Sequence, residues 1–120
     1  MMELTYQEKT RLLVAWFHEK KGVDITSIDL TGTFSVTEAT LFVSGKNTRH
    51  VQSLADCVLE GLGGNNLLYL GMEGYNSGLW ILIDCNDVIV HIFQESMRSF
   101  YNLEGLFAQE ARIELQLEDK

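Results

Sequence analysis

The sequence predicts a single domain of the α/β (α+β) class, with one mixed β-sheet of about five strands flanked by helices. Three observations lead to this prediction. The chain has 120 residues, an ordinary length for one domain. Segments with apolar residues at helical spacing alternate with short apolar segments rich in β-branched residues. The most apolar segment, from Leu79 to Phe93, has a short polar interruption that is typical of a β-hairpin.

The first helix is expected to begin at Thr5, because Thr5 and Glu8 form a Thr-x-x-Glu capping box. Two lysines near position 20 suit the C-terminal end of a helix, and Gly22 is expected to end it. The apolar face of this helix, at helical spacing, consists of Leu12, Leu13, Trp16 and Phe17.

Two strands are expected next, from Ile25 to Thr31 and from Ala39 to Ser44. Asp29 lies within the first of these strands. It has two interpretations: a carboxylate that faces outward or caps a loop, and an acidic residue of a functional site.

The turn around Gly45 and Lys46 superficially resembles a phosphate-binding loop. That pattern requires glycine at position 40 and Ser or Thr at position 47, where this chain has Thr40 and Asn47, so we reject it. Thr48 is instead expected to cap the second helix.

The second helix is expected to end at Gly63-Gly64, because glycine terminates helices readily. A third strand is expected from Leu67 to Leu70, followed by a loop from Gly71 to Gly78. The apolar stripe of the second helix consists of Val51, Leu54, Ala55, Val58 and Leu62.

The hairpin is expected to pair Leu79–Asp84 with Val88–Phe93, with Asn86 at positive φ in the turn. The second of these strands has no alternation of polar and apolar residues, so we expect an interior strand covered on both faces. A last helix is expected over Ser96–Ala108.

The chain is acidic, with 17 Asp and Glu against 9 Lys and Arg and a formal net charge of −8. This balance argues against non-specific nucleic-acid binding, and direct DNA binding is not expected. The acidic charge balance favours a basic partner, or serves solubility alone.

Cys57 and Cys85 are expected to be free, buried thiols in a reducing compartment. No apolar run is long enough for a membrane span, so we expect a cytoplasmic protein.

No metal site, cofactor site or catalytic residue is expected. His18, His50 and His91 have no metal-ligand spacing, and neither a Cys-x-x-Cys motif nor a nucleophile elbow occurs. Asp84 and His91, on opposed strands of the hairpin, have two interpretations: a general base with its orienting carboxylate, and a structural histidine bonded to a neighbour.

A set of short motifs resembles one known family over roughly residues 5 to 108. In the first half of the chain these are Asp29, Gly32, Thr37, Gly45, Arg49-His50-Val51 and Ala55-Asp56. In the second half they are Glu73-Gly74, Asn76-Ser77, Trp80-Ile81, Asp84, Asp87-Val88-Ile89-Val90-His91, Gln94-Glu95, Arg98, Tyr101, Leu103-Glu104 and Leu106. The chain resembles the ribosomal silencing factor (Iojap-like) family on these residues. The resemblance implies a family domain at 1–108 and leaves 109–120 as an acidic C-terminal tail.

The resemblance also implies a nucleotidyltransferase-like fold, and hence an alternative function as a nucleotide-binding protein or enzyme. Such enzymes use a Gly-Ser turn and alternating carboxylates that hold two divalent ions. Here Gly45 is followed by Lys46, and Asp84 and Asp87 are separated by a turn. Residues three apart do not project side by side from a strand, so we expect no enzyme.

The resemblance implies a regulator of translation that binds the large ribosomal subunit through its protein fourteen and sterically blocks association with the small subunit when nutrients are limiting. A monomer and a homodimer both remain open. Aromatic and acidic residues in and around the glycine-rich loop and hairpin fit a contact with a basic partner. The expected partner-binding residues are Trp80 and Asp84 first, then Glu73, Tyr69 and Tyr101. For Trp80 the structural alternative is burial under the last helix, and for Asp84 it is a turn cap or a partner of His91.

Overall fold

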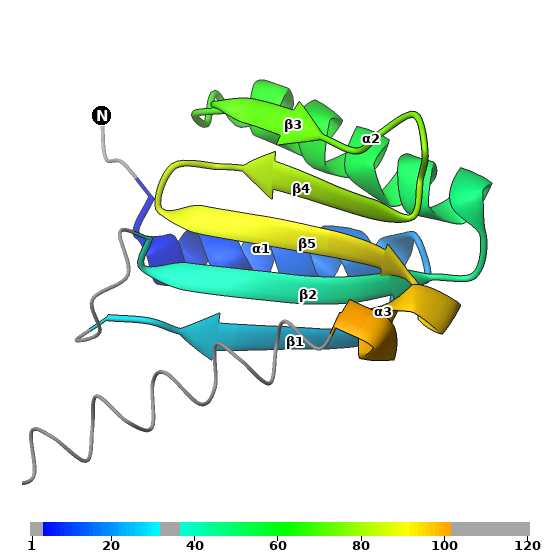
Figure 1. Cartoon of the computed structure of the whole chain (residues 1–120). Helices are drawn as coiled ribbons and strands as arrows, with labels where there is room; N and C mark the ends of the chain where they lie inside the picture. Colours follow the sequence, from blue (N-terminus) through cyan, green and yellow to red (C-terminus); the bar gives the residue numbers. More distant parts are fainter. Residues whose placement is uncertain (1–3, 32–36, 102–120) are drawn as a thin grey trace, which may run out of the picture.

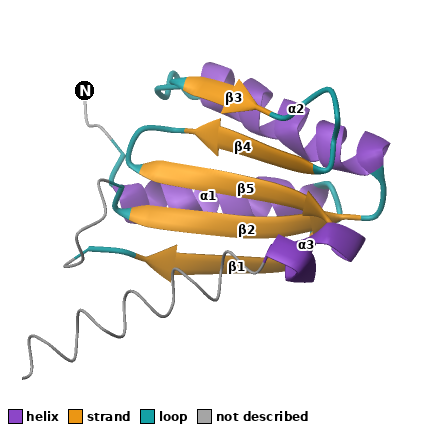
Figure 2. Cartoon of the chain, viewed as in Figure 1, coloured by secondary structure: helices purple, strands orange, loops and turns teal. Residues whose placement is uncertain are grey.

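The structure, a computed structural model, describes residues 4–31 and 37–101, the last three by their backbone alone. Five strands form one sheet, and two long helices lie side by side on one of its faces (Figures 1 and 2). The helices are α1 (Tyr6–Glu19), α2 (Thr48–Gly64) and α3 (Glu95–Tyr101). The strands are β1 (Val23–Asp29), β2 (Ala39–Gly45), β3 (Gly71–Glu73), β4 (Trp80–Asp84) and β5 (Val88–Gln94).

The sheet is mixed, as the sequence predicts, with strand order β1-β2-β5-β4-β3. Only β2 and β5 pair in parallel, and the other three pairs are antiparallel. The predicted hairpin is confirmed as β4 and β5, and Asn86 has a φ of 77° in its turn. β5 lies at the centre of the sheet, which confirms the predicted interior strand and explains its continuous apolar sequence.

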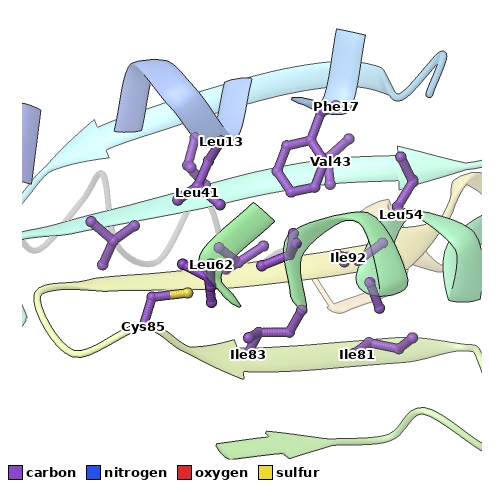
Figure 3. Packing of buried hydrophobic residues seen from close by; sticks show 14 of the residues in the cluster. Leu13, Phe17, Leu41, Val43, Leu54, Leu62, Ile81, Ile83, Cys85 and Ile92 are labelled. Carbon is purple, nitrogen blue, oxygen red and sulfur yellow. The ribbon is translucent and has the colours of Figure 1, made fainter. Parts of the chain in front are cut away.

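The core fills the space between the sheet and the two long helices (Figure 3). Alternate residues of a strand point to opposite faces, so one set from each central strand meets the helices. The α2 stripe predicted from the sequence is buried in this core. Both cysteines are free and buried, as predicted, and burial raises the pKa of Cys85 to about 12. The strand residues of the core are Ala39, Leu41, Val43, Ile81, Ile83, Val88, Val90 and Ile92.

The first helix begins as predicted but ends differently. Thr5 is the N-cap, and its side chain accepts a hydrogen bond from the Glu8 amide. The prediction that Gly22 ends the helix is wrong, because Lys21 adopts the left-handed conformation, with a φ of 60°. The Gly22 amide then donates to the Phe17 carbonyl at 2.7 Å, as in a Schellman motif. Gly22 is needed for space, since a Cβ there would lie 2.7 Å from the Val43 side chain.

For the second helix the predicted N-cap is wrong, whereas its predicted end at Gly63-Gly64 is confirmed. The N-cap is Asn47 and not Thr48: the Asn47 side chain accepts from the His50 amide at 2.8 Å. At the other end the helix stops at Gly64, and Asn66, two residues further on, takes the left-handed conformation with a φ of 56°. Gly61 lets the helices approach closely, because a Cβ there would lie 2.5 Å from the Trp16 ring.

Several strand boundaries move. The predicted strand over Leu67–Leu70 is wrong: the third strand is β3, inside the segment expected to be a loop. The first strand begins two residues earlier than expected and ends at Asp29. The Asp29 carboxylate accepts from the Thr31 amide at 2.9 Å and from the Tyr6 hydroxyl at 2.8 Å, which confirms the loop-capping interpretation. The last helix begins at Glu95, and its predicted part beyond Tyr101, the boundary at 108 and the tail lie outside the described residues.

Candidate partner-binding surface

The candidate surface begins with the sheet face that α1 and α2 do not cover (Figure 1). In β4 the burial alternates: Ile81 and Ile83 are buried against the helices, while Trp80, Leu82 and Asp84 are half-buried on the opposite face. The sequence therefore places two of the predicted partner-binding residues on the same face of one strand.

Aromatic rings form a connected layer on this face. The rings of Phe42 and His91 are 4.9 Å apart between centroids and 12° apart in plane. The Trp80 ring lies 5.4 Å from that of Phe93, with planes 17° apart. Parallel pairing of β2 with β5 and antiparallel pairing of β4 with β5 bring these side chains together from three strands.

Trp80 is held in this layer by a hydrogen bond to His91. Its indole Nε1–H donates to His91 Nδ1 at 3.1 Å. An indole N–H can only donate, so Nδ1 must be the unprotonated acceptor of the imidazole. Burial lowers the pKa of His91 to about 4, which favours this neutral form. The structural alternative for His91, a histidine bonded to a neighbour, is therefore confirmed.

Asp84 is not the partner of His91. In the hairpin register Asp84 lies opposite Ile89, and His91 lies opposite Leu82, so the expected opposed pair does not form. The Asp84 carboxylate instead accepts from the Asn86 amide at 2.9 Å and caps the turn. The interpretation of these two residues as a general base with its orienter is wrong, because the register offsets them and each has another partner.

The remaining predicted residues follow the sheet edge at β3. Glu73 lies opposite Leu82 and is exposed, and Tyr69, just before β3, is 44% exposed. Tyr101 is the last residue of α3, and its side chain lies outside the described residues. The backbone thus brings Glu73 beside the strand that holds Trp80 and Asp84, with Tyr69 on the approach to it.

Besides Tyr69, which was predicted, three exposed apolar residues next to these strands were not predicted from the sequence: Leu68, Leu70 and Leu79. Among the described residues, the exposed large apolar side chains are Leu68, Tyr69, Leu70 and Leu79, all next to β3 or β4. The apolar run Leu67–Leu70 is predicted to be a strand, and the signal for its exposure is its position directly after the Asn65-Asn66 turn, outside any alternating pattern. Leu68, Tyr69 and Leu70 adjoin the Asp84 end of β4, and Leu79 directly precedes its other end. Exposed apolar residues that are grouped, as in Leu68–Leu70, are a feature of interaction sites.

Asp84 and Asp87, the two carboxylates compared above with the metal-binding pair of a nucleotidyltransferase, each make a separate structural contact. Asp87 pairs with Lys9 at 2.5 Å, while Asp84 caps the turn. Among residues 4–31 and 37–101, no group of three or more His, Cys, Asp or Glu side chains is arranged to hold a metal ion. The turn at Gly45 and Lys46 has a structural role, since the Lys46 amide donates to His50 Nδ1 at 2.9 Å.

No helix in the described part of the chain is long and apolar enough to cross a membrane.

Comparison with known proteins identifies the family. A family model described as "Ribosomal silencing factor during starvation" matches residues 3–120. Proteins named ribosomal silencing factor RsfS are 32% identical in Bacillus subtilis, over 81% of this chain and 82% of the relative, and 32% identical in Chromobacterium violaceum, over 84% and 83%. A crystal structure of a Chromobacterium violaceum protein has a TM-score of 0.84 at 30% identity, covering 88% of each chain. The chain belongs to the ribosomal silencing factor family.

Proposed function

We propose that the chain is a non-enzymatic, cytoplasmic translation regulator that binds the large ribosomal subunit through its protein fourteen. Bound there, it would sterically block association with the small subunit and lower translation under nutrient limitation. Family membership over nearly the whole chain supports this proposal. The mechanism is occupancy of a surface, so it needs no cofactor.

The observation that carries the proposal is the composition of the β3–β4 edge. Trp80, half-buried and fixed by hydrogen bonding, lies on the same strand face as the Asp84 carboxylate, with exposed Glu73 on the neighbouring strand. Aromatic anchors surrounded by polar groups are typical of residues that dominate binding energy. Exposed apolar side chains at the same edge add area that a partner can cover.

Charge favours the same kind of partner. The chain has a formal net charge of −8, and ribosomal proteins are generally basic. Opposite charges raise the rate of encounter and orient the two surfaces before contact. Acidic residues at the edge, rather than acidic composition alone, would then determine where the basic partner binds.

Co-sedimentation tests the proposal directly. The chain is mixed with purified large subunits and centrifuged through a sucrose gradient, and small subunits are then added. We expect the chain to travel with the large subunit and to reduce the amount of joined particle. If the chain stays at the top of the gradient even at low salt, the proposed function is wrong although family membership stands.

A further inference from the structure

His91 lies at the centre of the sheet, in a position where its ring cannot move freely. It is 4% exposed and belongs to the interior strand β5. Its imidazole stacks on Phe42 at 4.9 Å and on Phe93 at 6.2 Å, with near-parallel planes in both pairs. A ring packed between neighbours loses its rotameric freedom when the protein folds, so it is available as a rigid support.

Trp80 reaches this support diagonally across the hairpin. Its direct partner in the register is Phe93, and His91 lies two residues away on the same face of β5. Diagonal neighbours across antiparallel strands lie within reach of aromatic side chains. The indole thus has a stacking partner in Phe93 and a hydrogen-bond acceptor in His91.

We propose that His91 is the positioning residue of the partner contact made by Trp80: its Nδ1 atom fixes the indole by accepting the Nε1–H. This inference rests on the proposed function. Without the His91 Nδ1 acceptor, the indole N–H would donate to a water molecule or to another group, and the Trp80 ring would sample other rotamers. With it, the ring is held in one orientation before the partner arrives, which lowers the entropy lost on binding.

The same hydrogen bond restricts what the partner can offer. The only polar atom of the indole already has an acceptor within the chain, so a partner that contacts the ring does so through its carbon atoms. A partner side chain that packs on Trp80 is therefore apolar or cationic, since neither kind needs the N–H. An Asn, Gln or carboxylate aimed at the indole nitrogen would lose its hydrogen bond.

A double-mutant cycle on large-subunit binding tests the proposal. His91→Phe keeps an aromatic ring but has no acceptor, and Trp80→Phe keeps a ring but has no N–H. We expect His91→Phe alone to weaken binding about fivefold to tenfold. In the Trp80→Phe background the same change is expected to alter binding by less than about twofold, because the bond no longer exists. Equal weakening in both backgrounds would overturn the proposal.

Hydrogen exchange of the indole N–H gives a readout in the free protein, without ribosomes. The chain has two tryptophans, so Trp80→Phe assigns the two indole signals in a ¹H–¹⁵N spectrum. We expect the Trp80 N–H to exchange at least about tenfold faster in His91→Phe than in the wild type. Unchanged exchange would show that His91 does not hold the indole.

Ile92→Val is the matched control, since Ile92 lies on the same strand and is buried on the opposite, helix-facing side. It loosens packing in β5 without touching the aromatic layer, and we expect neither binding nor Trp80 exchange to change beyond about twofold. If the wild-type chain does not bind subunits, the proposed function fails, and the exchange rates still decide whether His91 positions Trp80.

Discussion

Lys9 Nζ lies 2.5 Å from Asp87 Oδ1 and joins the first helix to the turn between β4 and β5. The Lys9 side chain is 6% exposed and that of Asp87 is 23% exposed, so the ammonium is the more deeply buried partner. The same ammonium donates to the Cys85 carbonyl at 3.1 Å. This pair fixes the position of the hairpin turn into which β4, the strand that holds Trp80 and Asp84, runs.

The two halves of this pair are expected to respond unequally to mutation. Asp87→Asn leaves a buried ammonium without a charged partner and should lower the free energy of unfolding by about 3 kcal/mol. Lys9→Met removes the buried charge, keeps the volume and leaves Asp87 near water, so we expect a loss of about 1 kcal/mol. Urea unfolding measures both. Equal losses would contradict the assignment of Lys9 as the desolvated partner.

Trp80→Ala is expected to weaken large-subunit binding by about 1–3 kcal/mol, because it removes the aromatic anchor of the proposed surface. The measurement is a binding titration in which the variant is first shown by circular dichroism to be folded. His18→Ala is the control, since His18 is exposed on α1, away from β4. Full binding by a folded Trp80 variant would remove this residue from the contact.

Asp84→Asn is expected to weaken subunit binding mainly at low salt. The substitution keeps an oxygen that can accept from the Asn86 amide, so the turn cap survives while the charge is lost. Charge pairing is screened by added salt, and the difference from wild type should shrink as the salt concentration rises.

The matched control for Asp84 is Asp56→Asn, which removes the same charge from an exposed position on α2. Both substitutions change the net charge by the same amount. An effect on binding that the two variants share therefore reports the overall charge and not a local contact. Identical salt profiles for the two variants would argue that Asp84 makes no specific pair with the partner.

His91 makes stability depend on pH. Burial lowers the pKa of His91 to about 4, from its ordinary value of 6.5. Between these values the unfolded chain binds a proton that the folded chain does not, so the free energy of unfolding decreases as pH falls. We expect a loss of about 2 kcal/mol between pH 7 and pH 5 from this group.

Urea unfolding at a series of pH values checks this dependence. His91→Phe is expected to be less stable than wild type at pH 7 and to lose less stability on acidification, because it has no imidazole to protonate. Parallel profiles for the two proteins between pH 7 and pH 5 would show that the titrating group is not His91.

The sequence predicted the sheet and hairpin because these follow from patterns within a few residues of one another. Val88–Phe93 is an apolar segment, and a three-residue turn that contains Asn86 and Asp87 precedes it. Helix ends were harder, since several neighbouring residues compete for one cap. Asn47 caps the second helix in place of the neighbouring Thr48, and Lys21 takes a left-handed conformation that ends the first helix before Gly22.

The candidate surface was predicted in part. Trp80 and Asp84 share a strand face through the period of two, which sequence alone provides. The hydrogen bond from Trp80 to His91 depends on the pairing register, which offset the expected opposed pair of Asp84 and His91. Register is a property of two strands together, and a one-residue difference in the turn changes which residues face each other.

Gly61 and Gly63 differ in surroundings although they lie two residues apart in α2. A Cβ at Gly61 would lie 2.5 Å from the Trp16 ring, whereas a Cβ at Gly63 would meet no atom within 4 Å. Gly61→Ala should therefore push the two helices apart and lower the free energy of unfolding by about 1–3 kcal/mol. Gly63→Ala should raise it by about 0.5 kcal/mol, because alanine favours the helix and reduces the freedom of the unfolded chain. Thermal unfolding of the two variants compares them directly, and a stabilising Gly61→Ala would show that α1 and α2 are not in close contact at Trp16.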